Sequence, residues 1–95
     1  MCQKRLTICF DVDGTLIHLN EKNKNVPRYD VIQLFYIFKK MGHDVMIWSG
    51  GGVSYATQWR DILGLDAKVI SKGSFVPDIA VDDQNTHLGK VDLQV

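Results

Sequence analysis

Cysteine and proline are both scarce in this sequence, which holds two of each among its 95 residues. Cys2 stands near the start of the chain, and Cys9 lies inside an apolar run. Two such residues provide neither a disulfide framework nor a cysteine-based metal site, so we expect both to be free thiols. Free thiols are typical of a reducing compartment, and we predict a cytoplasmic protein.

An excess of charge of either sign is also absent, because eleven basic side chains balance eleven acidic ones. Composition therefore gives no reason to expect a nucleic-acid-binding surface, although a nucleic acid is still possible as a substrate. No apolar run approaches the roughly 18 residues of a membrane span. The first residues also lack the apolar stretch of a signal peptide, so we expect no membrane partner.

What the sequence does contain is an alternation of short apolar runs with amphipathic segments. Strands are predicted at residues 6–11, 44–48, 67–70 and 78–81, with a further short strand at 91–95. Helices are predicted at 28–41 and 53–63, and the polar residues 14–27 form either a loop or a small hairpin. The apolar helix positions expected to face the core are Val31, Leu34, Phe35, Phe38 and Met41, then Ala56, Trp59, Ile62 and Leu63. This order predicts one α/β domain over residues 1–95, a Rossmann-like three-layer αβα unit with a mostly parallel sheet of four to five strands.

Acidic side chains interrupt the apolar stretch "ICFDVDGTL", residues 8–16, at Asp11 and Asp13. Burying a bare carboxylate is costly, so two of them at the end of a core strand call for an explanation. Polar residues also follow the other predicted strands, namely Ser49, Lys72, Asp82 and Asp83. Ligands of parallel α/β sheets bind outside the carboxyl ends of the strands, so we expect these residues to converge on one site.

The residue types at these strand ends predict a particular chemistry. Clustered carboxylates repel one another, and a hard divalent cation such as Mg²⁺ with oxygen ligands removes that repulsion. One aspartate can then attack a phosphoryl group, and a second, two residues on, can carry protons. The "SGGG" segment at 49–52 precedes a helix and can hold phosphate oxygens, while Lys72 supplies positive charge during transfer.

Taken in order, these residues resemble the motifs of the haloacid dehalogenase superfamily of phosphohydrolases. The first motif is "DVDGTL" at 11–16, and the second is the serine that ends "VMIWS". A lysine matched by Lys72 is the third, and the acidic pair that ends "IAVDD" at 79–83 is the fourth. Four fixed letters such as those of D-x-D-G-T arise by chance at roughly 10⁻⁵ per position, so the first motif is the most specific.

The resemblance implies a role for each acidic residue. Asp11 would be the phosphorylated nucleophile, and Asp13 the general acid and base. The metal would be bound by Asp11, by Asp82 and by Asp13, the last through its backbone carbonyl. Asp83 would support the metal site from its outer side or through a water.

The resemblance also implies a phosphate-binding set. Ser49 and the N–H of Gly50 would bind the phosphate, and Lys72 would steady both nucleophile and phosphate. Lys68 is a less favoured substitute for Lys72, because it lies inside a predicted strand. Thr15 is predicted to join the phosphate-binding residues, and it would bond to Asp11 or within the turn that follows.

Members of this superfamily often carry a cap domain over the active site. The segment 16–27 and the single helix between the second and third motifs are both too short for one, so the chain is similar to a capless, near-minimal member. An open site would suit a large phosphorylated substrate, a macromolecule included, or would need a partner subunit in an oligomer to cover it.

A narrower likeness joins "FDVDGTL", "WSGGG" and "AVDDQ". These stretches are similar to the phosphatase part of polynucleotide kinase–phosphatases, which remove terminal phosphates from nucleic acids. Those enzymes often carry arginine where this chain has Gly51.

Simpler interpretations of the same residues remain open at this stage. The aspartates after the strands could form Asx turns, and "SGGG" could be a flexible connection. The leading hypothesis is a Mg²⁺-dependent phosphomonoester hydrolase that acts through an aspartyl-phosphate. The alternatives are a non-catalytic phosphate-sensing or protein-binding module on the same fold, and a nucleic-acid end phosphatase. A phosphotransferase would normally need a cap to exclude water.

Overall fold

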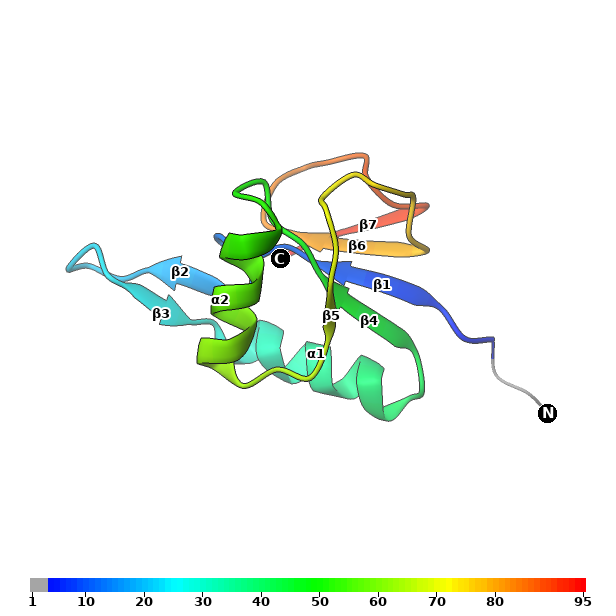
Figure 1. The fold of residues 1–95 in the computed structure, drawn as a ribbon, viewed down its shortest axis with the longest axis horizontal. Helices are drawn as coiled ribbons and strands as arrows, with labels where there is room; N and C mark the ends of the chain where they lie inside the picture. The colour runs from blue at the N-terminus through cyan, green and yellow to red at the C-terminus, as the bar shows by residue number, and fades with distance from the viewer. Residues whose placement is uncertain (1–3) are drawn as a thin grey trace.

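The computed structural model describes residues 4–95, and it confirms the predicted alternation of strands and helices (Figure 1). The elements are β1 (Thr7–Phe10), β2 (Ile17–Leu19), β3 (Asn25–Pro27), α1 (Tyr29–Lys40), β4 (Asp44–Ile47), α2 (Val53–Leu63), β5 (Lys68–Val69), β6 (Ile79–Asp82) and β7 (Val91–Gln94). Cys2 falls outside the described residues, and Cys9 is a buried free thiol, as expected. No helix within residues 4–95 is long and apolar enough to cross a bilayer.

The main sheet has five strands in the order β5-β4-β1-β6-β7, and every neighbouring pair is parallel. The α/β fold with a parallel sheet is therefore confirmed. β1 lies at the centre, and the chain builds outward through β4 on one side before it crosses to β6 on the other (Figure 1). This reversal of direction is the point at which such sheets bind ligands, and it places the carboxyl ends of β1 and β6 side by side.

The two faces of the sheet are covered differently. Both helices pack on the face that carries Ile8 and Phe10, because side chains from α1, α2 and these strand positions share one core cluster. Alternate strand residues such as Cys9 and Met46 point to the other face. Within residues 4–95 that face carries connecting segments, 70–78 and 83–90, where a third helical layer was expected.

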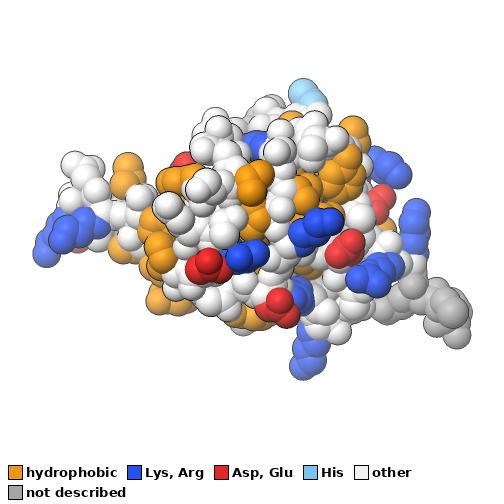
Figure 2. Space-filling view, in the orientation of Figure 1, with side chains coloured by type: hydrophobic (Ala, Val, Ile, Leu, Met, Phe, Trp, Pro, Cys, Tyr) orange, Lys and Arg blue, Asp and Glu red, His pale blue; other side chains and the backbone are white. Residues whose placement is uncertain are grey.

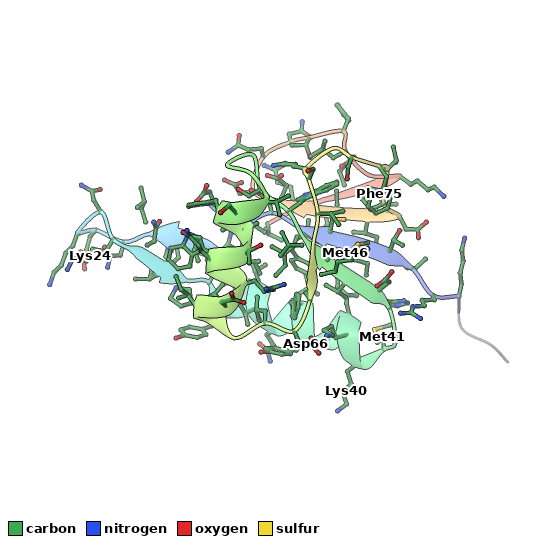
Figure 3. All side chains as sticks on the ribbon, in the orientation of Figure 1. Lys24, Lys40, Met41, Met46, Asp66 and Phe75 are labelled. Carbon is green, nitrogen blue, oxygen red and sulfur yellow. The ribbon has the colours of Figure 1, made fainter. Side chains whose placement is uncertain are left out.

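These connecting segments still bury apolar surface on the second face. Trp48 is fully buried there. The ring of Phe75, which is labelled in Figure 3, is edge-on to the Trp48 ring, with ring centroids 6.4 Å apart. Ile70 and Leu88 pack against the same cluster. The segment between β6 and β7 is too short to form a crossover helix, so irregular chain closes this side of the core.

Two of the residues predicted to face the core do not do so. Met41 is 49% exposed, because α1 ends at Lys40 and Met41 is already the residue that caps it. Ile62 is 67% exposed, because it lies well around the helix from the stripe of Ala56 and Leu63 that contacts the core. The other predicted helix positions are buried or packed against the core cluster.

The polar connection after β1 forms a hairpin of β2 and β3, which projects from the body of the molecule (Figure 1). At its base the guanidinium of Arg28 donates a hydrogen bond to the carbonyl of Gly14 at 2.8 Å. At its tip the side-chain carbonyl of Asn20 accepts hydrogen bonds from the N–H groups of Lys22 and Lys24. The two positions where a cap could be inserted hold only this hairpin and α2, so no cap domain lies within residues 4–95.

Candidate active site

A tight turn follows β1 and fixes the position of the first acidic motif. The carbonyl of Val12 accepts hydrogen bonds from the N–H groups of Thr15, Leu16 and Ile17. Gly14 adopts a φ of +77°, and a Cβ built on it would lie 2.1 Å from a carboxylate oxygen of Asp83. Glycine is therefore required here for both its conformation and its small size, since the fourth motif packs directly on this turn.

Three carboxylates converge at the carboxyl ends of β1 and β6. Asp11, Asp82 and Asp83 each offer an oxygen, and these oxygens lie within 4.8 Å of one another. Asp11 and Asp82 are buried, with exposed fractions of 6% and 2%. Oxygen donors of this kind suit a hard cation such as Mg²⁺, so the residues present fit the metal that the sequence predicts.

Lys72 approaches this cluster from the segment after β5. Its Nζ lies 3.1 Å from Asp11 Oδ1 and 2.9 Å from Asp82 Oδ2, so one ammonium group bridges two buried carboxylates. The structure thereby brings together Asp11, Lys72 and Asp82, which are distant in the sequence. Lys68, the less favoured lysine, lies in β5 with its side chain exposed.

The two buried carboxylates respond differently to this environment. Burial and the nearby charge of Asp82 raise the pKa of Asp11 to about 6, although the Lys72 ammonium opposes the rise. Burial also acts to raise the pKa of Asp82, but hydrogen bonds from the Gln84 N–H and from Lys72 outweigh it, and this pKa is lowered. For Lys72, the bonds to both aspartates outweigh burial and raise its pKa. Asp11 is thus the carboxylate that gains most from an added positive charge.

The carboxylate of Asp13 stands apart from this cluster. It is exposed, and the hydroxyl of Tyr55 donates a hydrogen bond to its Oδ1 at 2.5 Å. That bond is the main reason why the pKa of Tyr55 is raised. The sequence-based prediction omitted Tyr55, although its place in the first turn of the helix after "SGGG" is a signal that could have found it.

The glycine-rich segment after β4 forms one wall of the site. Ser49 is buried, and its Oγ accepts a hydrogen bond from the N–H of Gly51 at 3.0 Å. This bond uses the oxygen as an acceptor and leaves the hydroxyl hydrogen for another partner, and phosphate binding by Ser49 stays a prediction. Gly50 and Gly51 line the cavity, whereas Ser49 is not among its lining residues, and α2 begins directly after Gly52.

Thr15 differs from the other predicted site residues. Its side chain is fully buried, and its Oγ1 has no hydrogen-bond partner among residues 4–95. The turn directs Thr15 into the core together with Leu16 and Ile17, and Thr15 does not line the cavity. The expected bond to Asp11 or within the turn is therefore not made, and the expectation that Thr15 binds phosphate is corrected, because its side chain belongs to the core of the turn.

A cavity of about 420 Å³ opens at this edge of the sheet. The predicted residues that line it are Asp11, Asp13, Gly50, Lys72, Asp82 and Asp83. Gln84 and Thr86, from the segment after β6, line it as well and were not predicted. A second cavity of about 430 Å³ lies beside it at the hairpin, and Asp13 and Gly14 line both.

Comparison with known proteins places the residues of this site within one protein family. No curated protein and no solved structure matches the chain. The sequence model of one family, described as haloacid dehalogenase-like hydrolase, matches residues 8–90. This range runs from β1 past the acidic pair that ends β6, and so it includes all the residues that meet at the cavity. With most of its length and its whole acidic site inside the match, the chain belongs to the haloacid dehalogenase-like hydrolase family.

Proposed function

We propose that this protein is a Mg²⁺-dependent phosphomonoester hydrolase that acts through an aspartyl-phosphate on Asp11. The observation that carries the proposal is the buried Asp11 carboxylate, which is held by Lys72 beside Asp82 and lines an open cavity. A carboxylate can be phosphorylated where positive charge is fixed next to it. Membership of a hydrolase family supports hydrolysis as the reaction class.

In the first step, an oxygen of Asp11 attacks the phosphorus atom of a phosphate monoester. A new bond forms between this oxygen and phosphorus, and the bond between phosphorus and the leaving oxygen breaks. Asp13 donates its proton to the leaving oxygen, which departs as an alcohol. Lys72 fixes the orientation of Asp11 through its 3.1 Å contact and balances charge on the phosphoryl oxygens.

In the second step, the carboxylate of Asp13 takes a proton from a water molecule. The water oxygen attacks phosphorus, the bond between phosphorus and Asp11 breaks, and inorganic phosphate leaves. The carboxylate of Asp11 is then restored. Asp11, Asp82 and the Asp13 carbonyl, with Asp83 in support, would hold Mg²⁺, which would supply positive charge to neutralise the phosphate.

The openness of the site bears on the substrate and the partners. No cap covers the cavity within residues 4–95, which favours a large phosphorylated substrate or an oligomer in which a second subunit covers it. Lys22 and Lys24 are exposed at the end of the projecting hairpin, where Figure 2 shows basic side chains and Figure 3 labels Lys24, and they favour a nucleic-acid end as a narrower candidate. The buried free thiol of Cys9 agrees with the cytoplasmic location that we propose.

The proposal is tested with the full chain and p-nitrophenyl phosphate, with Mg²⁺ and after its removal with EDTA. We expect turnover that requires Mg²⁺ and falls at least a thousandfold in Asp11→Asn, because an amide cannot take the nucleophile's role. Asp78→Asn makes the same change at the other end of β6 and should keep the activity.

Two outcomes would contradict the proposal. Equal turnover in Asp11→Asn would show that another group attacks phosphorus. No hydrolysis of any ester in a panel of aryl, sugar, nucleotide and oligonucleotide phosphates, with phosphate binding retained, would favour the non-catalytic phosphate-sensing module.

A further inference from the structure

The contact between Tyr55 and Asp13 joins two parts of the chain that the catalytic motifs do not connect. Asp13 belongs to the turn after β1, and Tyr55 belongs to the first turn of α2. Their hydrogen bond, 2.5 Å long from the Tyr55 hydroxyl to Oδ1, is short for a bond between two oxygens. Asp13 is exposed, so without this bond its carboxyl group would be free to change rotamer.

A second observation shows that the chain makes room for this tyrosine. A Cβ built on Gly51 would lie 3.0 Å from Cδ2 and 3.2 Å from Cγ of the Tyr55 ring. Its φ lies outside the left-handed region, unlike that of Gly52, so its backbone conformation does not demand glycine. Glycine at position 51 instead allows the ring to lie against the backbone and extend its hydroxyl toward Asp13.

The location of Asp13 between two cavities also suits a proton donor. Asp13 lines both the cavity beside the acidic cluster and the cavity beside the hairpin. In the proposed reaction the phosphoryl group lies next to Asp11, and the leaving oxygen lies on the far side of phosphorus. A proton donor at the boundary between the two cavities is placed to serve that oxygen.

We propose that Tyr55 is a positioning residue for Asp13, which fixes Oδ1 so that the other carboxyl oxygen exchanges a proton with the leaving group. This inference rests on the proposed function, because Asp13 must act as general acid there. When Asp13 gives up its proton it becomes an anion, and the Tyr55 hydroxyl already donates to it. Tyr55 thus assists the departure of alcohols that need a proton, and it does not touch the phosphorus.

Tyr55→Phe removes the hydroxyl and keeps the ring. We compare kcat/KM for p-nitrophenyl phosphate, whose leaving group departs readily as an anion, with that for an alkyl phosphate, whose leaving group needs a proton. For the alkyl ester kcat/KM should fall by about tenfold or more, and for the aryl ester by less than about threefold. Because kcat/KM reports the steps up to the departure of the alcohol, the later use of Asp13 as base does not blur the comparison.

The matched control is Tyr36→Phe, the same change at a half-exposed tyrosine on α1, where both values should stay as in the parent protein. Equal losses for the two esters in Tyr55→Phe, or no loss for either, would overturn the positioning role. The proposed function fails separately, if Asp11→Asn keeps its activity toward both esters.

A crystal structure of Tyr55→Phe gives a readout that does not depend on turnover. We expect the Asp13 carboxylate to occupy more than one rotamer there, and a single rotamer in the parent protein. A single unchanged rotamer in the variant would overturn the proposal. Gly51→Ala should displace the tyrosine ring and reproduce the selective loss for the alkyl ester, and an intact bond to Asp13 with full activity would contradict the inference.

Discussion

The two ends of β6 carry aspartates whose surroundings are opposite in kind. Asp78, just before the strand, accepts hydrogen bonds from the N–H and the hydroxyl of Thr7 at 2.9 and 3.1 Å, and Lys90 Nζ lies 3.4 Å away. These donors hold the pKa of Asp78 below its ordinary value. At the other end, Asp82 lies beside Asp11 and Asp83, and it shares a single lysine, Lys72, with Asp11.

This difference separates a structural carboxylate from one prepared for chemistry. At the Asp78 end, donors outnumber acceptors and the negative charge is already satisfied. At the Asp82 end, three carboxylates lie together, Lys72 contacts only two of them, and the pKa of Asp11 is raised to about 6. Such a site is stabilised by an additional cation, whereas the Asp78 end gains nothing from one.

Removal of the lysine at each end of β6 should give the largest difference in catalytic activity between the two ends. Lys72→Met deletes the only ammonium described at the acidic cluster, and we expect kcat/KM with Mg²⁺ to fall by about a hundredfold or more. Lys90→Met, at the exposed contact with Asp78, should stay within about twofold. Steady-state kinetics on an aryl phosphate would measure both, and equal effects would show that the two ends do not differ as described.

The next largest effect is the response of stability to Mg²⁺. A cation that binds only the folded state at a hundred times its Kd adds about 2.7 kcal/mol to the free energy of unfolding. We expect the melting temperature to rise by several degrees with Mg²⁺ in the parent protein and in Asp78→Asn. Asp82→Asn, which removes a buried ligand, should lose most of that rise in a thermal scan. A full rise in this variant would place the cation elsewhere.

A smaller effect concerns pH in the metal-free protein. The folded pKa of Asp11, about 6, lies above its ordinary value of 3.8, so its charge destabilises the fold increasingly from about pH 4 to pH 6 and fully above that. Asp11→Asn should therefore raise the free energy of unfolding by about 2 kcal/mol at pH 8. The gain should vanish near pH 4 in denaturant titrations. A gain that persists at pH 4 would contradict the burial argument.

The smallest expected effect has the opposite sign. The pKa of Asp78 is lowered, so its contribution stabilises the fold above its ordinary pKa and is lost as the pH falls below it. Asp78→Asn should therefore lower the melting temperature slightly at neutral pH, with a smaller decrease in acid. The same denaturant and thermal titrations would reveal a wrong sign directly.

The positions of the acidic motifs could be predicted from the sequence because the fold rule that positions them is simple. Strands read from apolar runs end in Asp11 and Asp82, and parallel pairing on either side of β1 brings these ends together. Lys72 follows β5 at the same edge of the sheet, so its approach to Asp11 could be predicted in the same way. This prediction requires only where the strands end and that they pair in parallel, and it does not require the angle at which a helix packs on the sheet.

Features that depend on tertiary detail were not predictable in this way. The bond from Tyr55 to Asp13 requires the direction of α2 and the space above Gly51, neither of which appears in residue spacing. The burial of Thr15 depends on how the turn after β1 closes on Val12. The second face of the sheet is closed by irregular segments, whose packing has no periodic signal.

The central claim is that Asp11 attacks phosphorus at the edge where β1 and β6 end. Its most direct test adds borohydride during turnover with Mg²⁺, which reduces an aspartyl-phosphate to homoserine, and then locates the change by peptide mass spectrometry. The account predicts homoserine at position 11 alone, with Asp13, Asp78, Asp82 and Asp83 unchanged. Homoserine at any of those four positions, or none at all while phosphate is released, would contradict it.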